Sequence, residues 1–376
     1  MKKFLFFAAA LLCITAANAK VWRINYDDNA QADFKTIKLC LAWNGFTEGD
    51  TLYIEQGNHS GSTADNTISK PCTVIGIGWG FKDNKFDLSA STSSLLLKGI
   101  YVAADNVVLQ GVSTMSPIVL DASCANLHIE KCNIRGIRTT GGSASTHRVL
   151  NNLVIKNNYI QEFIYFGEYW NVYTASIVGN IIIGDVTFNK YYQGAGSSLT
   201  YAYYDNIIID HNTIVSNGTS LYNINPMTVF SNNIVINTKN ADDIKIDYFL
   251  NPSISTYNNV LSFTSATIAD AEYKGDNTYD PLKASTNKID ATVANTFTCD
   301  IAEGIVDNAM YYQVKDGAVA KTADSKGGEC GAFGGDFPYQ LNGRPNGVPY
   351  LYDINVPTHT DNNQLKISFK VAGNNE

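Results

Sequence analysis

The sequence predicts an all-β solenoid, because one short pattern recurs along the chain at the spacing of a structural repeat. The pattern is apolar, any, any, asparagine, any, apolar, and successive copies lie 20 to 32 residues apart. A period of this size, with β-branched strands and asparagine or glycine turns, is typical of coils that stack in register. The copies lie at residues 155–160, 177–182, 209–214, 230–235 and, more weakly, 256–261.

The recurring asparagine indicates a right-handed parallel β-helix. Each coil stacks about 4.8 Å above the previous one, so equivalent turn residues become vertical neighbours. A buried asparagine can then bond to the next coil, which satisfies an amide that is costly to bury. Leucine-rich repeats fit less well, because their leucine spacing and helical segments are missing. The expected single file contains Asn158, Asn180, Asn212 and Asn233, with Cys132 and Val112 in the same slot of earlier coils.

Residues 1–19 have the features of a signal peptide. Two lysines precede an apolar run over residues 4–14 that is too short to span a bilayer, and residues 17–19 are Ala-Asn-Ala. We therefore expect export to the periplasm, the cell surface or the medium, with no transmembrane segment. Lipidation at Cys13 is disfavoured, because Leu12 stands where a lipobox has a small residue.

Residues 32–43 are expected to form an amphipathic helix that caps the first coil. Such a cap protects the open sheet edge from strand addition. Strands should follow at residues 49–54 and 72–78, each beside a glycine turn. The buried face of the helix would carry Phe34, Ile37, Leu41 and Ala42.

The C-terminal region predicts a linker followed by two short strands. Residues 341–349 are rich in proline and glycine, whereas residues 350–356 and 365–371 alternate apolar and polar side chains. The two strands would cover the last coil as a hairpin or begin a small appended domain. The predicted organisation is a signal peptide at 1–19, a β-helix at 20–340 and a C-terminal linker and hairpin at 341–376.

Six cysteines remain after the signal peptide, and an exported chain permits disulfides between them. The alternative is that several are small buried apolar residues, which we favour for Cys132 because of its slot in the repeat. The pairing stays open, and no cysteine or histidine spacing predicts zinc. The six are Cys40, Cys72, Cys124, Cys132, Cys299 and Cys330.

Composition and charge restrict the partners. The chain is 45% hydrophobic and 16% charged, which is globular, and its net charge of -8 argues against nucleic-acid binding. We expect a monomer whose partner is an extracellular polysaccharide.

Several segments resemble the secreted right-handed parallel β-helix proteins of bacteria in the pectin-lyase-like group. Residues 32–34 and 49–54 are similar to the opening helix and first strand, and residues 71–76 to a strand entering a glycine turn. The Cys-Gly-Ala-Phe-Gly-Gly of 330–335 and the Pro-Tyr-Gln-Leu-Asn-Gly of 338–343 resemble the closing segment of a secreted subgroup. The resemblance implies the fold, but members include lyases, hydrolases, epimerases and proteins with no known reaction.

A polysaccharide lyase on this fold neutralises a uronate carboxylate with calcium, Arg or Lys and removes a neighbouring proton with a basic residue. Three of the five arginines lie within 14 residues, and a polygalacturonase-type Gly-His-Gly is absent. If the chain is an enzyme, a lyase therefore fits better than a glycoside hydrolase. We expect no cofactor, and calcium only for a lyase. The candidate catalytic residues are Lys156, Arg135, Arg138, His147 and Arg148, unless these form only a solvated turn with salt bridges.

Aromatic residues gather between Tyr159 and Tyr204, where 13 of 46 positions are aromatic. Sugar rings stack on flat aromatic faces, so an exposed cluster would form a polysaccharide-binding groove. The alternatives are that the rings fill the solenoid interior, or that the protein is a non-catalytic surface or adhesion protein. The candidate binding residues are Tyr165, Tyr169, Trp170, Tyr191, Tyr192, Tyr203 and Tyr204.

Overall fold

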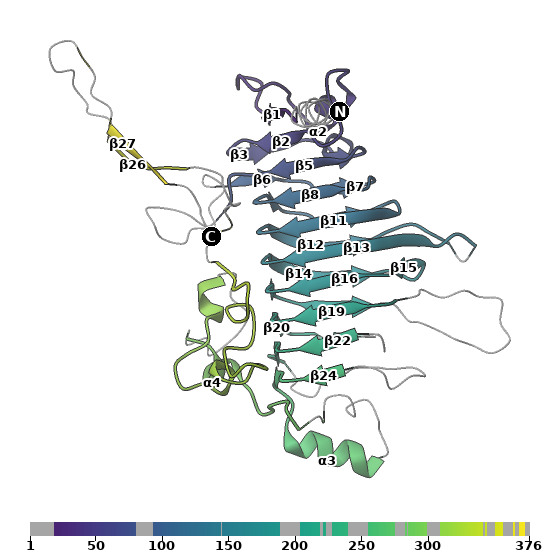
Figure 1. Ribbon diagram of the computed structural model, residues 1–376, viewed down its shortest axis with the longest axis vertical. Helices are drawn as coiled ribbons and strands as arrows, with labels where there is room; N and C mark the ends of the chain where they lie inside the picture. Colours follow the sequence, from purple (N-terminus) through teal and green to yellow (C-terminus); the bar gives the residue numbers. More distant parts are fainter. Residues whose placement is uncertain are drawn as a thin grey trace, which may run out of the picture.

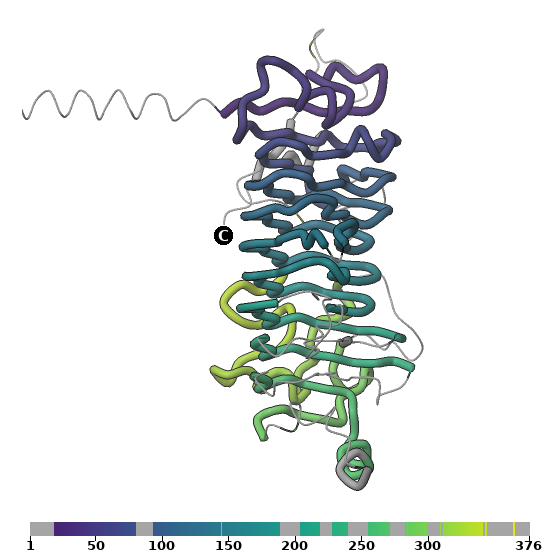
Figure 2. Tube along the Cα trace, turned by 90° about the vertical axis from the view of Figure 1, so that its right-hand side faces the viewer, coloured from purple at the N-terminus to yellow at the C-terminus, as the bar shows by residue number. Residues whose placement is uncertain are grey.

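The computed structural model describes residues 19–79, 93–143, 145–188, 204–218, 221–222, 228–239, 255–274, 283, 285–298, 309–340, 343, 350–355, 364 and 368–372. Parallel strands stack into an elongated column (Figure 1), and a view turned by 90° shows the successive coils (Figure 2). The predicted all-β parallel solenoid is therefore confirmed. Residues 1–18 of the predicted signal peptide lie outside the described ranges.

One sheet, called sheet A, runs the length of the column, and all its strand pairs are parallel. Its strands in stacking order are β1 (Val21–Ile24), β2 (Thr51–Ile54), β5 (Cys72–Ile75), β8 (Val107–Gln110), β11 (Cys124–Glu130), β13 (Arg148–Lys156), β16 (Ala175–Val178), β19 (Ile207–Asp210), β22 (Thr228–Ser231) and β24 (Ser255–Tyr257), with β15 (Trp170–Val172) also paired to β13.

The second sheet, called sheet B, follows the sharp turn at the end of each sheet A strand and bends into two rows. Its first row contains β3 (Gly57–His59), β6 (Ser94–Leu96), β9 (Ser113–Thr114), β17 (Ile181–Ile182), β20 (Thr213–Ser216), β23 (Ile234–Asn237) and β25 (Val260–Leu261). Its second row contains β4 (Thr67–Ile68), β7 (Tyr101–Val102), β10 (Ile118–Leu120), β18 (Asp185–Phe188) and β21 (Leu221–Tyr222). The longer strands β12 (Asn133–Thr139) and β14 (Tyr159–Phe166) run through both rows.

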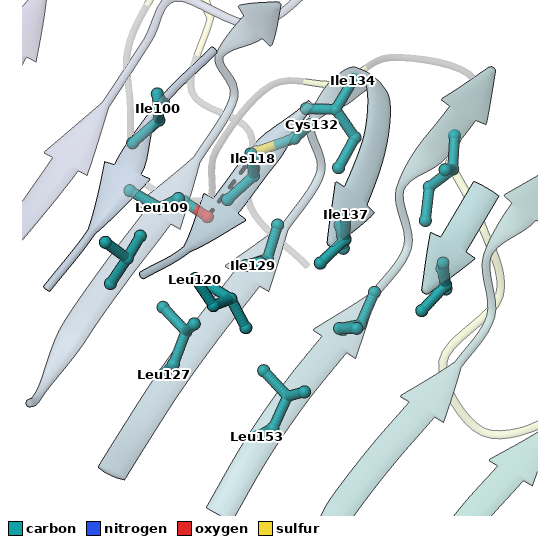
Figure 3. Close-up of a cluster of buried hydrophobic side chains, with 14 of the residues drawn as sticks. Ile100, Leu109, Ile118, Leu120, Leu127, Ile129, Cys132, Ile134, Ile137 and Leu153 are labelled. Atoms are coloured by element: carbon teal, nitrogen blue, oxygen red, sulfur yellow. Dashed lines mark hydrogen bonds between the residues drawn. The ribbon is translucent and has the colours of Figure 1, made fainter. Parts of the chain in front are cut away.

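Alternate residues of each strand point into the column and form its core. Leu109, Ile129, Ile155, Ile177 and Ile209 are register partners in successive strands of sheet A, and each is 0% exposed. β-Branched and leucine side chains fit such a pleated, buried surface, which is why they dominate the repeat. Figure 3 shows how sheet A contributes Leu109, Leu127, Ile129 and Leu153 to this core and sheet B contributes Ile118, Leu120, Ile134 and Ile137, with Ile100 added from just before β7.

The asparagines of the repeat form the predicted single file, here called the asparagine ladder. Each side-chain nitrogen donates to the side-chain oxygen of the next asparagine at 2.9 to 3.1 Å, from Asn158 through Asn180, Asn212, Asn233 and Asn259 to Asn287. Asn259 confirms the weaker copy, and Asn287 extends the ladder beyond the prediction. At the other end, the backbone nitrogen of Cys132 donates to Asn158 Oδ1 at 2.9 Å, so the Cys132 slot is confirmed.

The residue before Cys132, and before each ladder asparagine up to Asn259, has a left-handed backbone. Its φ is 52° at Lys131, 55° at Asn157, 50° at His211 and 55° at Asn232, and Gly179 has the same sign. Asparagine and glycine adopt this conformation most readily. Lys131 and His211 show that the turn also tolerates lysine and histidine, whose side chains point out of the ladder.

The N-terminal helix is shorter than predicted. The helix α2 (Ile37–Ala42) begins after Thr36, whose side chain accepts a hydrogen bond from the backbone nitrogen of Leu39 at 3.1 Å. Phe34 instead forms a β-bridge with Ile24 before the helix starts. Ile37 and Leu41 are buried as predicted, whereas Ala42 is exposed and Cys40 takes its place. A short 3-10 helix, η1 (Thr63–Asn66), lies next to α2.

The last coil is covered by the helix α3 (Ser265–Lys274), whose Ile268 packs against the core of the column. The predicted C-terminal strand pair is present as β26 (Tyr350–Asn355) and β27 (Ser368–Ala372), which pair antiparallel. Figure 1 draws this pair beside the N-terminal half of the column, at the opposite end from β24. Helix α3, and not the strand pair, therefore covers the last coil.

Residues 309–340, called the closing segment, lie against the outer face of the first row of sheet B (Figure 1). Gly331 N donates to Asn232 O at 2.8 Å and Ala332 N to Thr213 Oγ1 at 3.0 Å. Our sequence analysis placed these residues inside the β-helix, but they add no strand to the column. Their elements are η5 (Ala309–Tyr312) and η6 (Val319–Lys321), and α4 (Val293–Thr296) precedes them.

The closing segment explains why the first row is apolar on both faces. Tyr159, Ile181 and Ile234 point outward from sheet B, yet each is 0% exposed beneath the segment. Burial of this outer face removes water from large apolar side chains, which stabilises the contact. The part of the first row beneath the closing segment is therefore unavailable to a large ligand.

All cysteines in the described residues are free and buried, namely Cys40, Cys72, Cys124, Cys132 and Cys330. Cys299 lies outside those residues. The alternative of small buried side chains therefore holds for these five. No helix within the described ranges is long and apolar enough to cross a bilayer.

Candidate functional site

The outer face of the second row of sheet B is not covered by the closing segment. There, Arg138 of β12 is the register partner of Val119 of β10 and of Tyr165 of β14. Both Arg138 and Tyr165 point outward and are exposed, with Tyr165 37% exposed. Tyr101 continues the same outward line one coil above Val119. A cation and an aromatic ring therefore lie side by side on neighbouring coils.

The strand pattern explains this placement. Ile137 and Ile164 point into the core at 1% and 0% exposure, so their neighbours in an extended strand point outward. The register between β12 and β14 shifts between Ile134 and Gly136, which leaves one extra residue in β14. A Cβ at Gly136 would lie 3.1 Å from the Phe163 ring, so glycine leaves the space that this ring occupies.

Further polar groups flank the pair. Arg135 forms an ion pair with Glu162, with Nη2 2.6 Å from Oε1. Arg138, by contrast, makes no hydrogen bond or ion pair with another described residue. We call the exposed surface of Arg135, Arg138, Glu162, Phe163 and Tyr165 the arginine–tyrosine face.

Asp185 of β18 borders this face, as the register partner of Phe163. Its Oδ1 accepts a hydrogen bond from Ser216 Oγ at 2.6 Å. Burial raises the pKa of the Asp185 carboxyl, and the hydrogen bond only partly offsets this. The face therefore combines two arginines, two aromatic rings and one carboxyl group, and the Asp185 carboxyl lies at its border.

Arg148 and His147 lie apart from this face, at the start of β13. Arg148 Nη1 donates to the backbone oxygen of Thr140 at 2.8 Å and lies 3.1 Å from Asp121 Oδ1. His147 Nδ1 is 3.2 Å from Asn171 Oδ1, which holds the ring beside its own loop. Both side chains are thus bound into the local structure.

Lys156 lies at the opposite end of β13. Its register partners Glu130 and Val178, and Asp210 beyond them, occupy the single outward position predicted from the repeat. The Lys156 ammonium lies 3.8 Å from the centre of the Phe337 ring. The five predicted catalytic residues are therefore divided among three places, and the structure does not bring them together.

The predicted aromatic residues differ in exposure. Trp170 is 0% and Tyr204 2% exposed, because both rings belong to the core. Neither can present a ring face to a sugar, which corrects that expectation. Tyr169 is half-buried and packs edge-on against His147, with ring centres 5.9 Å apart. Tyr191, Tyr192 and Tyr203 lie outside the described residues, so Tyr165 is the exposed candidate.

Sequence reasoning missed Glu162, Phe163 and Asp185. Phe163 and Asp185 precede the buried Ile164 and Val186, so strand alternation was the available signal for these two residues. Glu162 lies at the register shift between β12 and β14, which alternation does not reveal. Within the described ranges, no group of three or more His, Cys, Asp or Glu side chains is placed to hold a metal ion.

The fold and the site define a class, namely parallel β-helix proteins with an exposed polar and aromatic face. No protein-family model and no curated protein matches the chain.

Proposed function

We propose that the protein is an exported β-helix protein that binds extracellular polysaccharide on the arginine–tyrosine face. The observation that carries this proposal is the register pairing of exposed Arg138 with exposed Tyr165. The predicted signal peptide is consistent with export.

The chemistry of the face suits a sugar chain. The exposed ring of Tyr165 offers a flat apolar surface for the C–H groups of a sugar, and its hydroxyl adds a hydrogen-bonding group. Arg138 offers several N–H donors to hydroxyl or carboxylate oxygens, and Glu162 can accept from hydroxyl groups. Because Tyr101 and Arg138 lie along one line of coils, a sugar chain can contact several coils at once.

The alternative of a polysaccharide lyase requires a proton acceptor beside the cation that binds the uronate. The predicted bases Lys156 and His147 lie away from Arg138, at opposite ends of β13, and the Glu162 carboxylate on the face is held in an ion pair with Arg135. Among the described residues, binding without bond cleavage therefore has the better support. Formation of unsaturated uronate products, followed by ultraviolet absorbance, distinguishes the two functions.

A binding panel of acidic and neutral polysaccharides tests the proposal by affinity electrophoresis. Tyr165→Ala and Arg138→Gln should each lower the affinity for the polysaccharide that the wild-type protein binds by about tenfold, a loss of roughly 1.4 kcal/mol. The weaker affinity appears as weaker retardation of the protein in the gel. Tyr257→Ala is the matched control, because Tyr257 is also 37% exposed but lies on sheet A. Equal affinity of all three variants and the wild type, or no binding to any polysaccharide, would refute the proposal.

A further inference from the structure

Three ionisable side chains meet at the turn between β19 and β20. His211 Nδ1 is 2.6 Å from Asp210 Oδ2, and His211 Nε2 is 3.6 Å from Asp324 Oδ2. Asp210 belongs to the column, whereas Asp324 belongs to the closing segment. The side chains of His211 and Asp324 are only 11% and 5% exposed. One imidazole therefore lies between carboxylates from two distant parts of the chain.

Hydrogen bonds fix both carboxylates in place. Asp210 Oδ1 accepts from Ser231 Oγ at 2.6 Å and from Asn232 Nδ2 at 2.8 Å. Asp324 Oδ1 accepts from the backbone nitrogen of Lys326 at 2.7 Å. The imidazole is confined as well, because a Cβ at Gly335 would lie 2.9 Å from its ring. Contacts other than those between the three groups therefore hold each carboxylate and the ring at this junction.

We propose that His211 is a proton-dependent clasp that holds the closing segment on the column. When both ring nitrogens carry protons, the imidazolium attracts one carboxylate from each part of the chain. A neutral ring can keep its hydrogen bond with Asp210 but no longer attracts Asp324 by charge, and the charges of Asp210 and Asp324 then face each other. The closing segment is therefore held more tightly at acidic than at alkaline pH.

Other charged groups near the clasp are already paired. Lys326 Nζ lies 2.7 Å from Asp336 Oδ1, and Lys321 Nζ lies 2.6 Å from Glu329 Oε2. The buried thiol of Cys330 is close to Asp210 and Asp324, and burial together with these carboxylates raises its pKa, so it stays uncharged. Neutralising His211 therefore leaves a net negative charge between the column and the closing segment.

The direction of the pH effect follows from the pKa shifts. Burial lowers the pKa of His211, but the hydrogen bond with Asp210 and the charges of Asp210 and Asp324 outweigh it and raise the pKa above its usual 6.5. The stabilisation is thus fully present below 6.5 and is lost as the pH rises through the raised pKa. The pKa values of Asp210 and Asp324 are lowered from 3.8, because their hydrogen bonds outweigh burial, so their contribution is lost only in stronger acid.

The repeat supplies two matched substitutions. Asparagine occupies the equivalent left-handed turn position at residues 157, 232 and 258, and lysine occupies it at residue 131. His211→Asn therefore removes the titrating group with the turn preserved. His211→Lys keeps a positive charge at every pH of interest. Asp324→Asn removes the negative charge that faces His211 from the closing segment. It tests the clasp without changing the turn between β19 and β20.

Hydrogen exchange of the backbone amides at residues 325–332, followed by mass spectrometry, tests the clasp. The exchange rate of each variant is compared with that of the wild type at two pH values, about 5.5 and about 8.5, which lie on either side of the usual histidine pKa. We expect the amides of His211→Asn and Asp324→Asn to exchange faster than those of the wild type at the lower pH, because each substitution removes one partner of the ion pair between the column and the closing segment. The difference should shrink at the higher pH, where His211→Lys should exchange more slowly than the wild type.

Amides of the asparagine ladder around residues 158 and 180 report that the column remains folded. Equal exchange of wild type, His211→Asn and Asp324→Asn at the lower pH would overturn the clasp. So would a constant ratio between variant and wild type at the two pH values, because a purely structural histidine would give it.

Discussion

The side-chain nitrogen of Asn180 donates to the side-chain oxygen of Asn212 at 2.9 Å, although 32 residues separate them in sequence. The same nitrogen also donates to the backbone oxygens of Ile155 at 2.8 Å and Val178 at 3.1 Å. Asn180 is 0% exposed, so one buried amide connects three coils. The asparagine ladder therefore fixes the register between coils.

Asn180→Ala should lower the free energy of unfolding by about 2 kcal/mol or more, because it leaves buried groups of the adjacent coils without partners. Urea denaturation measures the change. Asn151→Ala is the control, since Asn151 is exposed on β13 and its replacement should change stability by less than about 0.5 kcal/mol. Similar stabilities for the two variants would mean that the ladder does not stabilise the column.

Trp170→Ala should destabilise the protein by about 3 to 5 kcal/mol, because it empties a buried aromatic site. Tyr165→Ala should change stability by less than about 1 kcal/mol, because its ring is exposed. Thermal unfolding of both variants checks the assignment of one ring to the core and the other to the arginine–tyrosine face. A large loss for Tyr165→Ala would contradict it.

Gly335→Ala should cost more stability than Gly317→Ala. Both glycines have a left-handed backbone, with φ of 74° and 78° respectively, so alanine is strained by about 1 kcal/mol at either position. Only at Gly335 would the new Cβ meet the His211 ring, at 2.9 Å, whereas nothing lies within 4 Å of one at Gly317. The difference in unfolding free energy should be at least about 1 kcal/mol, and no difference would mean that Gly335 does not pack on His211.

Four buried cysteines should resist alkylation in the folded protein. Burial is the main cause that raises the pKa of each thiol to about 12, so the reactive thiolate is scarce near neutral pH. Mass spectrometry after iodoacetamide treatment should find these residues modified only when denaturant is present. Rapid labelling of the native protein, or a disulfide among them, would contradict the structure. The four are Cys40, Cys72, Cys124 and Cys132.

The repeat predicts the column well because one position carries a strict physical demand. A buried amide needs partners at every coil, so Asn158, Asn180, Asn212 and Asn233 recur and reveal the period. The same principle predicts the Cys132 slot, where the file of asparagines ends. The helix α2 was harder to delimit, because the cap at Thr36 competes with the apolar spacing that begins at Phe34.

The site was less accessible from sequence, because closeness in the chain does not mean closeness in a coiled fold. Arg135, Arg138 and Arg148 lie within 14 residues, yet Arg148 lies at the start of β13 in sheet A whereas Arg138 lies on sheet B. Asp324 and His211 lie 113 positions apart but come together, because the closing segment runs back along the column. No repeat predicts that return.

Hydrogen exchange with and without a bound polysaccharide tests the central claim most directly, namely that the exposed outer face of sheet B is the binding surface. We expect the amides of residues 135–139 and 161–166 of sheet B to exchange more slowly when polysaccharide is bound. The amides of residues 154–156 and 176–178 of sheet A should change little. Protection confined to sheet A, or to the closing segment, would contradict the account.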